Sequence, residues 1–110
     1  MSWWQERPYR LLQTNLREID IPLDAEVYAR GVEDWGANVA LFNVGGIVAN
    51  YDTHLPFHYR NPRLSGDTVG EVIEHLHRRG IRFIGRFDFS KVNAAIGGSH
   101  PDWLYRDLCG

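Results

Sequence analysis

The chain has 110 residues, of which 44% are hydrophobic and 24% are charged, and its formal net charge is −2. This composition is typical of one small globular domain and argues against a disordered tail. Because no excess of basic residues creates a positive field, we expect neither nucleic acid nor an acidic membrane surface as a partner.

The first predicted unit is a strand followed by a helix. Residues 10–15, RLLQTN, read as the strand. Asp24 can accept hydrogen bonds from the free N–H groups at the start of the helix, and Gly36 supplies the left-handed residue that ends it. An apolar stripe at helical spacing is expected to pack in the core, with Trp35 included; its members are Ala25, Tyr28, Val32 and Trp35.

A second strand, a second helix and a third strand follow. Residues 38–46, NVALFNVGG, contain a short apolar run typical of a strand buried on both faces. The helix is predicted within residues 66–80, and IRFIGRFDF, residues 81–89, is the third strand. The helix places four apolar residues on one face, which are Val69, Val72, Ile73 and Leu76. His75 and His77 are expected on its solvent side.

The order of elements predicts an α/β fold. Strands connected through helices run parallel, with right-handed crossovers, so we expect a parallel βαβαβ sheet. A parallel sheet needs both faces covered, and two helices do not cover both faces of three strands. The chain is therefore expected to be part of a larger sheet.

Polar residues gather where the strands end. Asn15 and Arg17 follow the first strand, Asn43 ends the second, and Arg86 and Asp88 end the third. Ligands of such folds bind at the carboxyl ends of the strands, so these five side chains are candidates for a binding site. An ion pair between Arg86 and Asp88 that only orders the rim is the structural alternative.

The opposite face of the third strand carries aromatic residues. Phe83, Phe87 and Phe89 alternate with the polar residues of this strand, so we expect them on the face where the helices pack.

A long segment, residues 45–66, separates the second strand from the next helix. Connections of this kind usually have about 2–6 residues, and longer ones are often functional. It contains Tyr51, His54 and His58, whose rings and donors suit a sugar. A surface loop that packs on itself is the alternative. Pro56 argues against a helix that would bring the two histidines onto one metal ion, so no metal is expected.

Nothing in the sequence predicts an organic cofactor, because neither G-x-G-x-x-G nor a Walker phosphate loop occurs. The single cysteine, Cys109, excludes a disulfide framework. The start of the chain lacks the apolar core of a signal peptide, and no apolar run is long enough for a bilayer. We therefore expect a cytoplasmic protein.

Several longer stretches carry a family resemblance: WWQERPYRLLQTNLREID, GANVALFNVGGIVANY, GIRFIGRFDFSKV and HPDWLYRD. Together they resemble the opening of a family of hypothetical glycoside hydrolases with a TIM barrel, and more distantly the alpha-L-fucosidases. The resemblance runs over essentially the whole chain, and the ordered set with HPDW after the third strand is its most specific part.

The resemblance implies a (β/α)8 barrel that hydrolyses O-glycosidic bonds, and a carbohydrate as its substrate. Residues 1–110 would be the N-terminal portion of this barrel, truncated at the C-terminus and inactive alone, and an oligomer is compatible with the full-length protein. Glycosidases generally use two carboxylates. Asp88 is the acidic residue at a strand end, and it is a candidate first for a substrate ligand and second for one of these carboxylates. Asp52 is an alternative in the loop, and the sequence identifies no partner carboxylate. A non-catalytic carbohydrate-binding or interaction domain is the rival hypothesis.

Overall fold

The computed structural model describes residues 1–109. Its elements, in chain order, are α1 (Trp3–Glu6), β1 (Leu11–Thr14), the 3-10 turn η1 (Glu18–Asp20), α2 (Ala25–Asp34), β2 (Val39–Gly46), α3 (Thr68–Arg78), β3 (Arg82–Asp88), α4 (Ala94–Ser99) and the 3-10 turn η2 (Pro101–Trp103).

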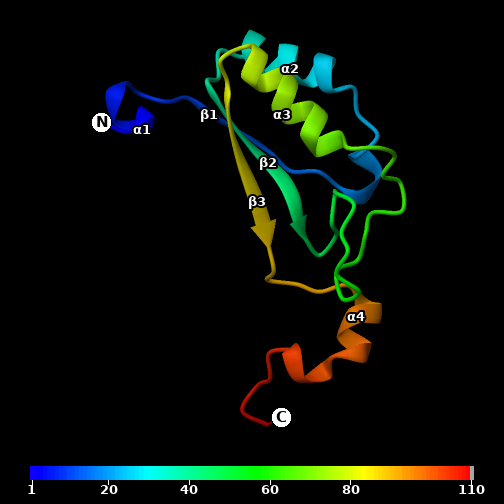
Figure 1. Cartoon of the computed structure of the whole chain (residues 1–110). Helices are drawn as coiled ribbons and strands as arrows, with labels where there is room; N and C mark the ends of the chain where they lie inside the picture. The colour runs from blue at the N-terminus through cyan, green and yellow to red at the C-terminus, as the bar shows by residue number, and fades with distance from the viewer. Residues whose placement is uncertain (110) are drawn as a thin grey trace.

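The three strands form one parallel sheet in the order β1-β2-β3. The prediction of a parallel βαβαβ unit is therefore confirmed. The crossovers after β1 and after β2 return along the same face of the sheet, so all three carboxyl ends lie at one edge (Figure 1).

The helices α2 and α3 pack on one face of the sheet, and the core lies between these helices and the sheet (Figure 1). Phe42 of β2 has no exposed surface, and Ala29 of α2 and Leu76 of α3 are equally buried around it. Residues that alternate with Phe42 point to the other face, where Leu11 is 42% exposed and Ile84 is 37% exposed. The residues described thus leave one face of the parallel sheet uncovered. This agrees with the prediction that two helices do not cover both faces of three strands.

The predicted ends of α2 are confirmed at atomic level, and α3 begins within its predicted range with a similar cap. The carboxylate of Asp24 accepts from the N–H of Val27 at 2.9 Å, and that of Asp67 accepts from the N–H of Gly70 at 3.0 Å. Gly36 ends α2 with a φ of 77°, in the region that residues with a Cβ avoid.

The core prediction for Trp35 is wrong, because its side chain is 82% exposed. Helix α2 ends at Asp34, and its buried stripe is formed by smaller residues: Ala25, Ala29 and Val32. Trp35 is the residue that caps the helix, and it lies beside this stripe rather than on it.

Two further expectations about side chains need correction. Phe83 packs against the core, but Phe87 and Phe89 are 49% and 69% exposed, since they lie beyond the part of β3 that helices cover. His75 does not point freely to solvent; its Nδ1 lies 2.8 Å from the carboxylate of Glu26 and joins α3 to α2. His77 is exposed, as expected.

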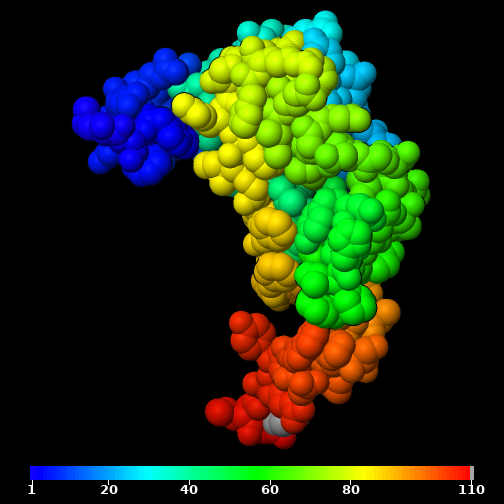
Figure 2. Space-filling model, viewed as in Figure 1, coloured from blue at the N-terminus to red at the C-terminus, as the bar shows by residue number. Residues whose placement is uncertain are grey.

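The chain after β3 projects beyond the carboxyl edge of the sheet as a small separate lobe formed by α4 and η2 (Figure 2). Inside it, the rings of His100 and Trp103 stack with centroids 3.8 Å apart and planes 6° apart. Phe57, from the long loop after β2, contacts Trp103 edge-on at 5.5 Å between centroids. The loop and the lobe therefore meet through aromatic rings.

In residues 1–109, no helix combines the length and the apolar character that crossing a membrane requires.

Candidate functional site

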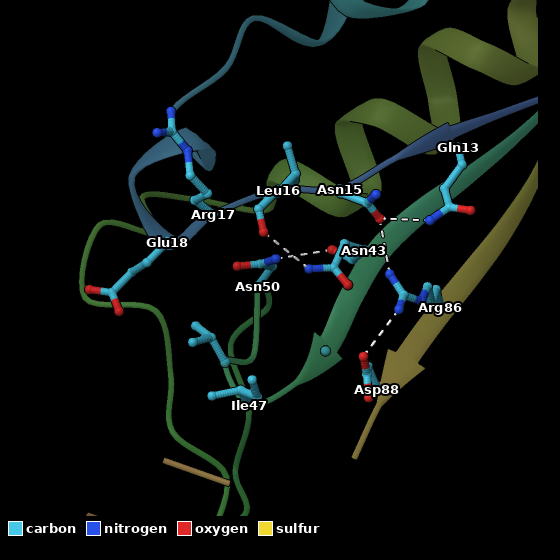
Figure 3. A pocket seen from close by; sticks show the side chains of 12 residues that line it. Gln13, Asn15, Leu16, Arg17, Glu18, Asn43, Ile47, Asn50, Arg86 and Asp88 are labelled. Atoms are coloured by element: carbon cyan, nitrogen blue, oxygen red, sulfur yellow. Dashed lines mark hydrogen bonds and ion pairs between the residues drawn. The ribbon is translucent and has the colours of Figure 1, made fainter. Parts of the chain in front are cut away.

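A polar pocket of about 480 Å³ lies at the carboxyl ends of β1, β2 and β3 (Figure 3). Its polar lining residues are Gln13, Asn15, Arg17, Glu18, Asn43, Asn50, Arg86 and Asp88. The structure thus brings together five of the residues singled out in the sequence, namely Asn15, Arg17, Asn43, Arg86 and Asp88. The parallel strands explain this, because their carboxyl ends meet at one edge.

Arg86 is the centre of the hydrogen-bond network in this pocket. One terminal nitrogen of its guanidinium group donates to Asn15 Oδ1 at 3.0 Å, and the other donates to Asp88 Oδ2 at 3.1 Å. Gln13 also donates to Asn15 Oδ1, at 2.8 Å. The side chains of β3 and of the segment after β1 therefore meet above the end of β2, which lies between them in the sheet.

Asp88 is held as a carboxylate. Its Oδ1 accepts from the backbone N–H of Ser90 at 2.9 Å and from the Ser90 hydroxyl at 2.6 Å. These hydrogen bonds, with the charges of Arg86 and Lys91, lower the pKa of Asp88 below its ordinary value. A group stabilised in this way is an acceptor or a negative charge near neutral pH, and is unsuited to donate a proton.

Two glycines set the distance between the ends of β2 and β3. The pairing shifts between Asn43 and Gly45, which leaves Val44 as a bulge. Gly46 has a φ of 127°, and a Cβ on it would lie 2.0 Å from the backbone oxygen of Asp88. A Cβ on Gly45 would lie 2.8 Å from the ring of Phe87. Glycine is needed here for close approach of the two strands, which fixes the backbone of Asp88 at the pocket.

A chain of asparagine amides supports the opposite wall, which Asn43 and Asn50 line. Asn43 Nδ2 donates to the carbonyl of Leu16 at 3.4 Å, and Asn50 Nδ2 donates to the carbonyl of Asn43 at 3.0 Å. Asn61 Nδ2 donates to Asn50 Oδ1 and to the carbonyl of Glu18, both at 3.0 Å. This network ties the segment after β1 and the long loop to the end of β2.

Sequence reasoning missed Asn50 and Asn61, although they are 3% and 0% exposed. No motif marks them, because asparagine is common in loops. Their role depends on the loop returning to β2, where Ala49 and Arg60 form an isolated bridge. Gln13 and Glu18 also line the pocket without having been singled out as site residues.

Arg17 lies at the rim of the pocket with its side chain 73% exposed. Its guanidinium group binds both oxygens of Asp20, at 2.9 Å each. The hydrogen bonds from Arg17 lower the pKa of Asp20 to about 2.

Tyr51 and His58 line a different cavity, of about 350 Å³, which is mainly aromatic. Tyr51 Oη lies 3.0 Å from His58 Nδ1, and His58 Nε2 is buried with no hydrogen-bond partner among the described residues. His54 is exposed and lines neither cavity. The eight expected site residues are therefore divided between a polar pocket, an aromatic cavity and the loop surface.

Among residues 1–109, no three His, Cys, Asp or Glu side chains are arranged to hold a metal ion. The polar pocket offers amides, the guanidinium groups of Arg17 and Arg86, and the carboxylates of Glu18 and Asp88, which are groups that bind hydroxyls.

Comparisons with known proteins place the chain in context. Residues 24–110 match the family model of hypothetical glycosyl hydrolase 6. The fold is similar to that of alpha-L-fucosidase isoenzyme 2 from Paenibacillus thiaminolyticus, with a TM-score of 0.73 and 18% sequence identity. The similarity covers 92% of this chain and 16% of the fucosidase chain. No curated protein matches the sequence.

At 18% identity, the likeness to the fucosidase shows the fold alone. The three parallel strands and their helices have the arrangement of the corresponding part of a chain that contains a TIM barrel. In such a barrel the face opposite the helices is the interior, which agrees with the uncovered face that bears Leu11 and Ile84.

Proposed function

Because the chain belongs to the hypothetical glycosyl hydrolase 6 family, we propose that its polar pocket binds the sugar of an O-glycoside whose bond the natural protein hydrolyses. The observation that carries this proposal is the convergence of Asn15, Asn43, Arg86 and Asp88 at the carboxyl edge of the sheet. Active sites of TIM-barrel enzymes lie at this edge.

The groups in the pocket fit a sugar for a chemical reason. A sugar presents several hydroxyls, each a donor and an acceptor, so it is bound best by a mixture of both kinds of group. Amides supply donors and acceptors together, and a guanidinium group beside a carboxylate does the same. The volume of about 480 Å³ lies within the usual range for small-molecule sites.

Hydrolysis of a glycoside generally needs two carboxyl groups that flank the scissile bond. Of the described residues, Glu18 and Asp88 bring carboxyl groups to this pocket. Figure 3 shows the carboxyl group of Glu18 on the far side of the pocket and directed away from Arg86. We therefore assign Asp88 to substrate binding or charge stabilisation, and propose that residues 1–110 alone do not turn over substrate.

The rival function, binding without catalysis, is favoured by the hydrogen bonds of Asp88. Both of its oxygens are occupied by Arg86 and Ser90, so the carboxylate is a fixed ligand rather than a free nucleophile. The two functions differ in whether bound glycoside is cleaved.

The test compares the natural full-length polypeptide with its Arg86→Ala and Asp88→Ala variants on a panel of nitrophenyl glycosides. We expect both substitutions to lower kcat/KM by about tenfold or more, with little change in Tm, because each removes charge-assisted hydrogen bonds in the pocket. Glu74→Gln, which breaks an exposed ion pair within α3, is the matched control and should leave kcat/KM unchanged.

Binding of a glycoside without release of nitrophenol would favour the rival function. Absence of both binding and hydrolysis across the panel would contradict a carbohydrate site. A large fall in Tm with unaltered kinetics would mean that Arg86 and Asp88 serve only to hold the strands together.

A further inference from the structure

Both arginines that line the polar pocket, Arg17 and Arg86, are paired with carboxylates of the protein. Arg86 lies 3.1 Å from Asp88, and Arg17 lies 2.9 Å from Asp20. The Glu18 carboxyl group is directed away from Arg86 (Figure 3). The remaining polar lining side chains are neutral amides: Gln13, Asn15, Asn43 and Asn50. A ligand in this pocket therefore meets dipoles, a compensated ion pair and the carboxylate of Glu18, and each of the two arginines among the described lining residues already has a counter-ion.

Asp88 is fixed in its position beside Arg86. Its Oδ1 accepts two hydrogen bonds from Ser90, and its backbone is pressed against Gly46 of the neighbouring strand. Arg86 is fixed in turn, because its other terminal nitrogen donates to Asn15. The pair is half-exposed at the pocket, with side chains 36% and 39% accessible, so a ligand can reach both partners.

This arrangement acts differently on neutral and on acidic sugars. A neutral sugar can donate a hydroxyl to Asp88 and accept from the amides. A uronic acid, which carries a carboxylate on the same ring, would need Arg86 as its counter-ion, but that guanidinium group already binds Asp88. The uronate would also lie beside the negative charge of Asp88, and like charges at such distances repel.

We propose that Asp88 is a specificity-determining residue that neutralises the positive charge of Arg86 and thereby selects uncharged sugars over uronic acids. This inference rests on the proposed function of the pocket as a sugar site. It assigns to Asp88 a task that is separate from any part in cleaving the glycosidic bond.

Asp88→Asn is the decisive substitution. The amide keeps the shape of the side chain but releases Arg86 to bind a carboxylate of the ligand. A charge-assisted bidentate contact is stronger than a neutral hydrogen bond, and we expect the affinity for a uronate, relative to its neutral partner, to rise about tenfold or more. The gain should shrink as salt is added, because it is electrostatic.

The experiment measures, by calorimetric titration of the natural full-length polypeptide, the Kd of three matched pairs of methyl glycosides. The pairs are glucoside and glucuronide, galactoside and galacturonide, and mannoside and mannuronide. The wild type should bind the neutral member of at least one pair more tightly than its uronide. Asp88→Asn should shift this ratio toward the uronide, Arg86→Gln with Asp88→Asn should abolish the shift, and the control Glu74→Gln should reproduce the wild type.

The possible results separate the two proposals. A wild type that prefers a uronide, or an Asp88→Asn variant with an unchanged ratio, overturns the role of Asp88 and leaves the sugar site standing. Absence of binding for all six glycosides overturns the sugar site and this inference with it. If Asp88→Asn melts far below the wild type, Asp88→Ser replaces it in the titrations. Independently of any variant, a ratio of Kd values that favours the uronide in the wild type overturns the proposal.

Discussion

Asn61 donates its side-chain amide to Oδ1 of Asn50 at 3.0 Å, and neither residue has more than 3% of its surface exposed. Asn61 also donates to the carbonyl of Glu18, and its own Oδ1 accepts from the N–H of Arg63 at 2.9 Å. One buried amide therefore joins the segment after β1 to two parts of the long loop.

We expect Asn61→Asp to lower the free energy of unfolding by about 1–3 kcal/mol or more. The substitution keeps the size of the side chain but removes the two donated hydrogen bonds, and it leaves buried acceptors without partners. Urea denaturation of the purified protein measures the change. His54→Ala, in an exposed part of the same loop, is the control, and an equal loss there would contradict a special role for Asn61.

Gly46→Ala should destabilise the protein by several kcal/mol, roughly the sum of the costs of a strained backbone and of overpacking. The added Cβ would lie 2.0 Å from the backbone oxygen of Asp88, and the φ of 127° is unfavourable for alanine. Thermal melting provides the measurement. Gly31→Ala, in α2 with open space around its Cβ position, should instead stabilise by about 0.5–1 kcal/mol. Equal effects at the two sites would refute the steric argument.

Acid should weaken the contact between α2 and α3. Hydrogen bonding from Arg79, and secondarily from His75, lowers the pKa of Glu26 from its ordinary 4.5. A lowered pKa in the folded state means that the contribution of Glu26 to stability is fully present above about pH 4.5 and is lost as the pH falls through the lower, folded value.

The measurement is unfolding by urea at pH 7 and at pH 3. We expect Glu26→Gln to be less stable than the wild type at pH 7, and the difference to shrink at pH 3, because the unfolded wild-type chain binds a proton at Glu26 below about pH 4.5. Glu71→Gln, an exposed change on α3, should differ little from the wild type at either pH. A Glu26→Gln deficit that is the same at both pH values would rule out the ion pairs as its source.

Trp35→Ala is expected to change the free energy of unfolding by less than about 0.5 kcal/mol, because its side chain is 82% exposed. Phe42→Ala, at a fully buried position between the two helices and the sheet, should cost about 3–5 kcal/mol. Chemical denaturation of the two variants side by side is the check. A large loss for Trp35→Ala would show that this ring is covered in the natural protein.

Much of the architecture could be predicted from local patterns. The capping residues Asp24 and Asp67 and the apolar spacing of α3 fix where helices form, because these effects act within a few residues along the chain. The parallel order of the strands follows, since strands joined by helices have little alternative. Consequently the sequence predicts that Asn43, Arg86 and Asp88 lie together.

What local patterns could not supply are contacts between distant segments. Trp35 has the spacing of a core residue, but α2 ends at Asp34, one residue before it. The burial of the Trp35 side chain therefore depends on where α2 ends relative to β2, and the side chain is exposed. Tyr51 and His58 lie in a loop whose path decides which side of the strand ends they reach, and it carries them to the aromatic cavity.

The parallel α/β unit and the polar edge at its strand ends follow from the sequence, because hydrophobic period, capping and the order of the elements are properties of the chain itself. Two features depend on tertiary packing: Asn61 holds Asn50 at the wall of the pocket, and Arg86 joins Asp88 to Asn15. Hydrogen bonds and ion pairs of this kind depend on distances of a few ångströms between residues as far apart as 15 and 86. Such distances are set only when the loop, the bulge at Val44 and the glycines of β2 are packed together.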